Sequence, residues 1–225
     1  MRVIVIGAGV LGASAAFHAA LAGAHVVLVD QAHDGRATAA GAGIVCPWLS
    51  GSTDPEWYRI ASAGACYLPT LVQHLAGFGE HDLGYRRVGA LSVASSEREL
   101  DGIEALARAR RAGAPDAGDV SRLDSRQAQA LFPPLHPELE AVHVSGGARV
   151  DGRLLAAALC RAMERQGGAL VHNSGDGRRA PARSAFRRCA ATLACRGGSS
   201  GSAPSSRPLP RSSGQIESGR EGCCR

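Results

Sequence analysis

The sequence predicts an α/β fold that opens with a strand, helix, strand unit, and three observations support this. The short apolar run Val3–Ile6 has the length of a buried strand and leads directly into the glycine-rich segment Gly7–Gly12. An alanine-rich stretch then predicts a helix that can lie close against a sheet, with Gly23 where a helix C-cap residue is expected. A second apolar run, Val26–Val29, ends at Asp30. This order of elements is that of a Rossmann nucleotide-binding unit.

The glycine segment has the chemistry of a pyrophosphate site. A pyrophosphate needs backbone N–H donors and a helix N-terminus, and only a turn without side chains lets it approach. Gly7 makes the turn, Gly9 admits the phosphates, and Gly12 lets the helix and strand pack. Asp30 can accept hydrogen bonds from both ribose hydroxyls and would repel a 2′-phosphate, which argues against NADP. The fold alone does not decide between FAD and NAD.

Residues 35–50, GRATAAGAGIVCPWLS, predict a loop of small residues whose backbone is approached by something flat or bulky. A second layer of strands and helices is expected after it. Its predicted elements are a helix over 56–76 that Pro69 kinks or breaks, a strand over 88–94, a helix over 97–112, a short helix over 124–132, a strand over 142–144, a helix from the N-cap Asp151 to 167–168, and a strand over 169–172. Arginines expected on solvated faces are Arg86, Arg87, Arg108, Arg110 and Arg111.

The segment 173–225 differs in composition from everything before it. It holds ten of the 25 basic residues but three of the 20 acidic ones, and it shows no helical or strand periodicity. It cannot bury enough apolar surface to offset its ordering entropy, so we predict a disordered tail. The abrupt change suggests the hypothesis that a frameshift or gene-model error near residue 173 replaced the native continuation. Its cysteines lack the paired spacing or nearby histidines of a zinc site, so no metal site is predicted.

Composition also argues against several classes of protein. No apolar run is long enough to span a membrane, and Gly7 interrupts the N-terminal apolar run too early for a signal peptide. We therefore expect a cytoplasmic protein without a transmembrane segment, with peripheral membrane contact left open. The excess positive charge lies in the tail and lacks interleaved aromatic residues, so no specific nucleic-acid binding is expected. The sequence does not predict an oligomeric state.

Four blocks of the sequence, in this order, resemble the D-amino-acid oxidase superfamily of FAD-dependent oxidoreductases. The blocks are VIVIGAGVLGASAAFHAALAGAHVVLVD, GRATAAGAGIVCP, DLGYRRVGALSVASSERELDGIEAL, and VSRLDSRQAQALFPPL followed by GGARVDGRLLAAALCRAMERQGGAL. Within the superfamily they are most similar to the glycine oxidase and D-amino-acid dehydrogenase branch. The resemblance covers residues 1–172 and implies an FAD-type Rossmann domain interleaved with an incomplete α+β substrate domain. Residues 1–50 would form the FAD-binding βαβ unit and flavin loop, and residues 51–172 mixed Rossmann and substrate-domain segments.

The resemblance implies FAD as the cofactor, bound in extended form. The residues it assigns are Gly7, Gly9, Val10, Leu11 and Gly12 at the pyrophosphate, Asp30 at the ribose, and Thr38, Ala39, Ala42, Gly43 and Ile44 in a loop that passes the phosphates and the isoalloxazine. Two departures from the family pattern stand out. Asp30 replaces the usual Glu and is one methylene shorter, and neither Ala39 nor Ala40 is the usual serine.

The resemblance also implies a reaction, in which a hydride passes from Cα of a small D-amino acid or glycine to flavin N5 and leaves an imine. The expected partner is therefore a small amino-acid or amine substrate. Catalytic residues are not assigned, because family members take their carboxylate-binding arginine, active-site tyrosine and a further flavin-binding strand from a second half that this sequence does not match. Weak or absent turnover is expected. Two alternatives stay open: a non-catalytic nucleotide-binding fragment and an NAD-dependent Rossmann oxidoreductase.

Overall fold

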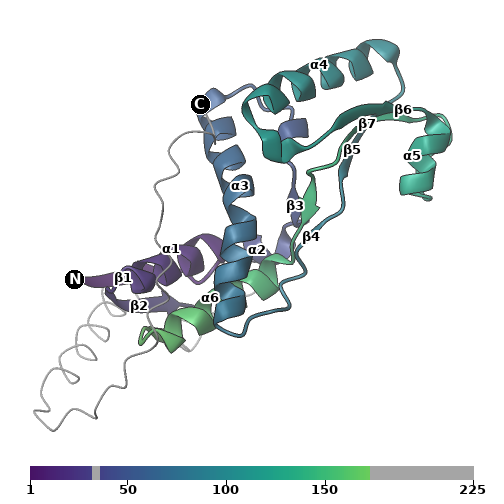
Figure 1. The fold of residues 1–225 in the computed structure, drawn as a ribbon. Helices are drawn as coiled ribbons and strands as arrows, with labels where there is room; N and C mark the ends of the chain where they lie inside the picture. Colours follow the sequence, from purple (N-terminus) through teal and green to yellow (C-terminus); the bar gives the residue numbers. More distant parts are fainter. Residues whose placement is uncertain (32–35, 173–225) are drawn as a thin grey trace, which may run out of the picture.

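The computed structural model describes residues 1–31 and 36–172, which form two parts linked by the long helix α3 (Figure 1). The predicted disorder of the tail and its proposed frameshift origin lie outside the described residues. In chain order the elements are β1 (Arg2–Ile6), α1 (Val10–Leu21), β2 (His25–Asp30), α2 (Ala37–Ala40), β3 (Ile44–Val45), η1 (Pro47–Leu49), α3 (Pro55–Gly77), β4 (Arg86–Arg87), β5 (Ala90–Ala94), α4 (Glu97–Gly113), η2 (Pro115–Ala117), β6 (Val120–Leu123), α5 (Ser125–Leu131), β7 (Glu140–Val144), β8 (Ala148–Arg149), α6 (Gly152–Arg165) and β9 (Ala169–His172).

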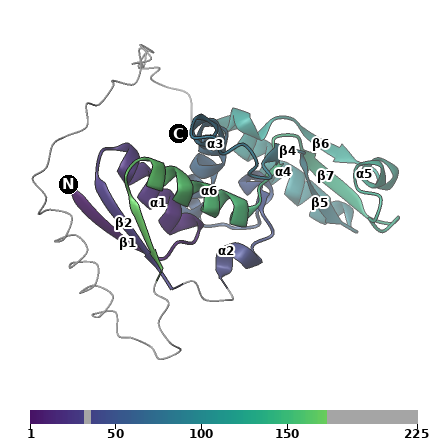
Figure 2. The same cartoon turned by 90° about the horizontal axis from the view of Figure 1, so that it is seen from below.

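The first part is a parallel sheet in the order β1-β2-β9, with α1 and α6 side by side next to it (Figure 2). Strand β1 pairs with β2 from Arg2 opposite His25, and β2 pairs with β9 up to Asp30 opposite His172. All the elements of the second part lie between β2 and α6 in the chain, so the two parts are interleaved. The predicted α/β class with an opening Rossmann unit is confirmed, whereas the division at residue 50 stays a prediction.

Small side chains let α1 lie close to its neighbours, as the alanine-rich sequence predicts. Ala13, Ala16 and Phe17 of α1 are fully buried in one hydrophobic core with Leu159 of α6. Gly23, just past the helix, has a φ of +80°, a backbone conformation that L side chains rarely adopt. The predicted helix end is therefore confirmed. The glycine turn before α1 is in turn held against the sheet, because the N–H of Gly7 donates to the carbonyl of Val29 in β2.

Helix α3 continues through Pro69, so of the kink or break predicted at this residue the break is wrong, while the kink stays a prediction. Proline removes one helical hydrogen bond and crowds the preceding turn, which costs about 3 kcal/mol in an isolated helix. Leu68, Leu71 and Leu75 flank Pro69 and are all buried in the core that α3 shares with α1 and α6. Burial of side chains on both sides of the proline outweighs the local cost and keeps the helix continuous.

The second part is built on the antiparallel sheet β5-β7-β6, against which α4 packs (Figure 1). Strand β6 was not predicted, and the predicted strand over 88–94 begins at Ala90. The segment predicted as a loop over 35–50 contains α2, β3 and η1, so that prediction is wrong in detail. The two-residue strand β3 exists because Ile44 pairs with Arg149 of β8, a long-range contact that no local pattern signals.

A buried carboxylate ties the segment after α3 to α6. Glu80 is only 7% exposed, and its two oxygens accept hydrogen bonds of 3.0 Å from Nε of Arg161. Arg165 also pairs with Glu80, with Nη1 at 2.8 Å from Oε1. The hydrogen bond from Arg161, together with the charges of both arginines, holds the pKa of Glu80 below its usual value. Glu80 therefore stabilises the contact between the segment after α3 and helix α6 as an ionised group.

We expect Glu80→Gln to lower the free energy of unfolding by about 2 kcal/mol at pH 7, because charge-assisted hydrogen bonds to a buried carboxylate are lost. A depressed pKa contributes stability that is present above the unfolded value, about 4.3, and is lost as pH falls through the folded value. The difference between wild type and variant should thus shrink at pH 3. Urea unfolding at pH 7 and pH 3 measures this difference in the free energy of unfolding. The control is Glu56→Gln, which removes the exposed Glu56–Arg59 pair. A difference that persists at pH 3 would contradict this account.

Candidate dinucleotide site

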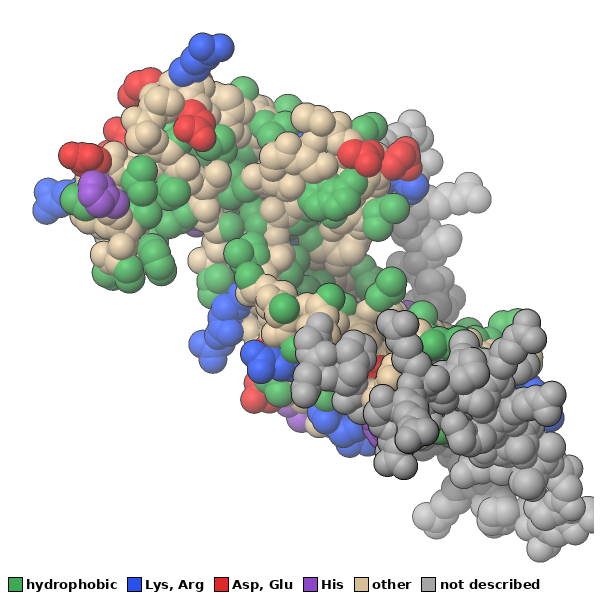
Figure 3. All heavy atoms as spheres, turned by 180° about the vertical axis from the view of Figure 1, so that it is seen from behind, with side chains coloured by type: hydrophobic (Ala, Val, Ile, Leu, Met, Phe, Trp, Pro, Cys, Tyr) green, Lys and Arg blue, Asp and Glu red, His purple; other side chains and the backbone are tan. Residues whose placement is uncertain are grey.

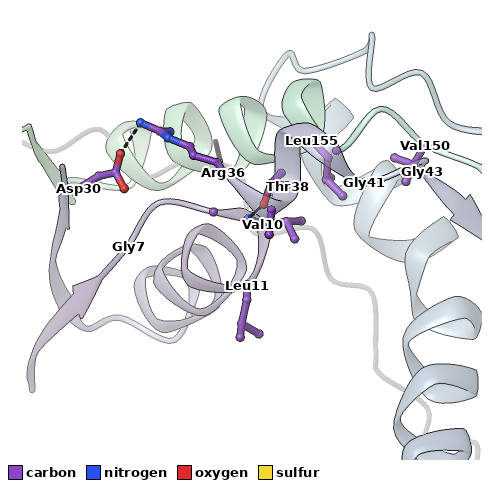
Figure 4. A pocket seen from close by; sticks show the side chains of 13 residues that line it. Gly7, Val10, Leu11, Asp30, Arg36, Thr38, Gly41, Gly43, Val150 and Leu155 are labelled. Atoms are coloured by element: carbon purple, nitrogen blue, oxygen red, sulfur yellow. Dashed lines mark hydrogen bonds and ion pairs between the residues drawn. The ribbon is translucent and has the colours of Figure 1, made fainter. Parts of the chain in front are cut away.

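A pocket of about 640 Å³ lies where the glycine turn, the end of β2, α2 and the start of α6 meet (Figure 4). Its lining residues are Gly7, Gly9, Val10, Leu11, Asp30, Arg36, Ala37, Thr38, Gly41, Gly43, Val150, Gly152 and Leu155. Four separate stretches of the sequence supply these residues. The site is therefore assembled by the tertiary fold and not by the glycine turn alone.

The glycine turn leaves the N-terminus of α1 open to an anion. Gly7 has a φ of +96°, and its N–H donates to the carbonyl of Val29 at 2.7 Å. A Cβ at Gly12 would overlap the Gly7 carbonyl oxygen, so only glycine allows this approach. The N-cap residue Gly9 has no side chain to cap the helix, and the first-turn N–H group of Leu11 has no carbonyl partner within the helix. These features suit a bound phosphate.

Asp30 stands at the carboxyl end of β2 and is 7% exposed. Its Oδ1 accepts the N–H of Ala8 at 2.9 Å, and its Oδ2 lies 2.6 Å from Nη2 of Arg36 (Figure 4). The first contact fixes the carboxylate against the glycine turn, and the second brings a cation to the pocket wall. Since an ionised carboxylate has about four lone-pair sites, both oxygens can still accept from ribose hydroxyls. Sequence reasoning did not single out Arg36.

Thr38 joins α2 to the glycine turn. Its Oγ1 accepts the N–H of Val10 at 2.9 Å, and a Cβ at Gly9 would lie 3.2 Å from the same oxygen. The Val10 N–H, which the resemblance assigned to the pyrophosphate, is therefore engaged by the protein. Thr38 also supplies a hydroxyl directly before Ala39 and Ala40, the two positions at which the resemblance implies a serine.

The structure gathers most of the predicted cofactor residues but not all of them. Those lining the pocket are Gly7, Gly9, Val10, Leu11, Asp30, Thr38 and Gly43, while Ala39 lines a neighbouring pocket. Gly12, Ala42 and Ile44 line neither pocket: Gly12 packs against Gly7, and Ile44 is 74% exposed. Lining residues that the sequence did not predict are Arg36, Ala37, Gly41, Val150, Gly152 and Leu155. The last three belong to the block that carries the resemblance, but nothing in its spacing places it beside the glycine turn.

The neighbouring pocket has a volume of about 440 Å³ and shares Gly9, Arg36 and Thr38 with the first. Cys160 and His172 are among its lining residues, which come from α6 and β9. Burial raises the pKa of the Cys160 thiol, so this group stays protonated at neutral pH. Within residues 1–31 and 36–172, no group of three or more His, Cys, Asp or Glu side chains could hold a metal ion.

Comparison with known families shows to which family the chain belongs. The sequence model of the DAO family, described as FAD dependent oxidoreductase, matches residues 2–215. This chain belongs to the DAO family. The cofactor of this family is FAD, which decides against the NAD-dependent alternative.

This DAO-family chain is similar to three proteins that are described in turn. It is 46% identical over 168 residues to the uncharacterized oxidoreductase YurR of Bacillus subtilis (strain 168), covering 75% of this chain and 45% of YurR. It is 33% identical over 160 residues to glycine oxidase of Pseudomonas aeruginosa, covering 70% of this chain and 42% of that protein. The crystal structure of iminodiacetate oxidase from Chelativorans sp. BNC1 superposes with a TM-score of 0.73 at 51% identity, covering 76% of this chain and 46% of that one. The chain thus spans about half the length of the curated relatives it matches.

On the face in Figure 3, arginine side chains of the described part are interspersed with acidic ones and form no continuous basic surface there. None of the helices in the described ranges combines the length and the apolar character needed to cross a bilayer. The dinucleotide pocket therefore remains the feature from which a function can be argued.

Proposed function

We propose that this chain forms the FAD-holding half of an oxidoreductase that oxidises the C–N bond of a small amino acid or related amine. The observation that carries the proposal is the pocket in which an open helix N-terminus and a buried carboxylate lie together. An FAD pyrophosphate and its adenosine ribose require these two groups side by side. When bound, FAD supplies the hydride acceptor for the oxidation.

Five pocket residues have a definite part in this proposal. Gly9 and Leu11 offer backbone N–H groups to the pyrophosphate, and Asp30 accepts hydrogen bonds from the ribose hydroxyls. Thr38 holds α2 against the turn, so that the following loop residue Gly43 lies at the far side of the same pocket. The chain's own contribution is to bind and orient the dinucleotide in a site whose groups are fixed beforehand.

The substrate class is argued from the relatives. The printed names of two of them are glycine oxidase and iminodiacetate oxidase, and both named substrates carry a nitrogen on a carbon next to a carboxylate. We therefore propose an α-amino acid of similar size whose nitrogen is a primary or secondary amine. Catalytic residues are not proposed, because the proposal gives the pocket residues parts in binding FAD and none in the oxidation.

Titration of the purified chain with FAD tests the first half of the proposal. We expect the flavin absorbance bands to shift and flavin fluorescence to change with a micromolar dissociation constant, and ADP-ribose to compete. Anaerobic addition of glycine, iminodiacetate or D-alanine tests the second half, because bleaching of the flavin band reports reduction without needing an electron acceptor. Glycolate and lactate are matched controls that carry a hydroxyl in place of the nitrogen.

The outcomes test the cofactor proposal and the substrate proposal separately. Binding of FAD with bleaching by the amino acids supports an oxidoreductase, even if the rate is slow. Binding of FAD without bleaching by any of them supports the non-catalytic nucleotide-binding fragment. A chain that folds but leaves FAD spectrally unchanged would overturn the cofactor assignment for this chain.

A further inference from the structure

The sequence predicts Arg110 on a solvated face, and this prediction is wrong. The side chain reaches from α4 to η1 and the residues after it, which lie 58–63 positions earlier in the chain. Its Nη1 donates to the carbonyl oxygens of Pro47 at 3.1 Å, Trp48 at 3.3 Å and Ser50 at 2.6 Å. Its Nη2 donates to the carbonyl oxygen of Ser52 at 2.8 Å. One side chain thus collects four backbone acceptors from a segment of six residues, Pro47–Ser52.

The surroundings of Arg110 suit a guanidinium and not another cation. Its central carbon lies 4.4 Å from the centre of the Tyr58 ring, a cation–π distance. No carboxylate of the described ranges forms an ion pair with it, so carbonyl dipoles and the ring balance its charge. A lysine has no planar fork and presents three donors from one nitrogen, so it cannot reach the same four acceptors while stacking on a ring.

Nearby arginines of the same helix behave differently. Arg108 is 60% exposed and pairs with Glu104 one turn away, while Arg111 is 52% exposed and pairs with Asp119. Both are surface ion pairs of the kind that contribute little stability. Arg110 alone among these three joins α4 to the Pro47–Ser52 segment. This difference makes Arg108 a matched control for Arg110.

The Pro47–Ser52 segment continues directly from the proposed flavin loop. Only Cys46 separates it from β3, whose Ile44 pairs with Arg149 of β8. One residue earlier, the carbonyl of Gly43 accepts the N–H of Val150 at 2.9 Å, and both of these residues line the dinucleotide pocket. The chain from Gly43 onward is thus fixed at one end by strand pairing and at the other by Arg110.

We propose that Arg110 is a positioning residue that holds the Pro47–Ser52 segment on α4 and thereby sets the position of Gly43 in the dinucleotide pocket. The part of this inference that concerns FAD rests on the proposed function. Arg110 acts through the backbone that it binds and does not line the pocket itself. Helix α4 of the second part would in this way help to fix the geometry of the dinucleotide pocket in the first part.

The test uses the whole chain with Arg110→Lys, Arg110→Ala and the control Arg108→Ala. Hydrogen exchange of the amides of residues 43–52 is measured without FAD, and the FAD dissociation constant is measured by flavin fluorescence. We expect both Arg110 variants to lose protection selectively in 43–52 and to bind FAD about tenfold more weakly, with Arg108→Ala unchanged. Millimolar guanidinium should restore FAD binding to Arg110→Ala, whereas equal ethylammonium should not.

Two results would overturn the inference. One is wild-type protection of 43–52 in both Arg110 variants, which would mean that the segment does not depend on the guanidinium. The other is an even loss of protection through the whole chain without rescue by guanidinium, which would make Arg110 a general stabilising residue only. If the wild type itself binds no FAD, the proposed function fails, but the exchange measurement still decides whether Arg110 holds the segment.

Discussion

Gly12→Ala is expected to lower the free energy of unfolding by about 3 kcal/mol and to abolish FAD binding. An added Cβ at this position would overlap the Gly7 carbonyl oxygen, and neither group can move without shifting α1 or the turn. Overpacking a tight core contact costs about 1–3 kcal/mol, and a backbone atom yields less than a side chain. Because α1 supplies the open N–H groups, any shift that relieves the clash also displaces the phosphate site.

Urea unfolding and FAD titration measure the effect of Gly12→Ala, with Gly64→Ala as the matched control. Gly64 lies within α3, and a Cβ there would meet no atom within 4 Å. The control should therefore raise stability by about 0.5–1 kcal/mol through helix propensity alone. A Gly12→Ala protein as stable as wild type and still able to bind FAD would show that the helix and strand do not need this close contact.

Asp30→Ala is expected to raise the FAD dissociation constant about 100-fold. Hydrogen bonds to a charged group contribute about 1.5–3 kcal/mol each, and each 1.4 kcal/mol is a factor of ten in affinity. The substitution also leaves the Ala8 N–H and the Arg36 guanidinium without this acceptor, which loosens the turn and the pocket wall. Asp30→Glu should bind FAD within a few-fold of wild type, because the carboxylate is kept and the longer side chain is the usual one in the family.

The control for Asp30 is Asp119→Ala, which removes an 88% exposed carboxylate paired with Arg111 far from the pocket. It should leave FAD affinity unchanged. Melting temperatures measured without FAD separate loss of binding from loss of the fold. Equal FAD affinity of wild type and Asp30→Ala would mean that the ribose is bound elsewhere.

The first part of the fold could be predicted because its signals are local. Val3–Ile6 and Val26–Val29 are apolar runs of strand length, and the glycines between them permit one kind of turn. Asp151 was likewise recognisable as an N-cap, because its carboxylate acts on N–H groups two or three residues away. For these elements, whose structure depends on residues close in sequence, the sequence pattern was sufficient to predict the structure.

The rest could not be predicted because it depends on long-range partners. Strand β3 requires β8, and the helix through Pro69 requires the core on its buried side. The sequence around Arg110 resembles that around its exposed neighbours Arg108 and Arg111. Only the tertiary contact with Pro47–Ser52 distinguishes Arg110 from them. In the site itself, the sequence did not single out Arg36 or Val150, since no spacing rule connects them to the glycine turn.

The pairing of β2 with β9 has a consequence for how this chain folds. Asp30 and His172 are neighbours in the sheet but 142 positions apart in the chain (172 − 30), so the sheet has high contact order. Loop-closure entropy grows slowly with length, and a folded insertion between the two strands shortens the effective loop. We expect the antiparallel sheet and α4 to form early, with docking of α6 and β9 as the slow step. Until that step occurs, the pocket lacks Val150, Gly152 and Leu155, and nascent chains would hold the dinucleotide poorly.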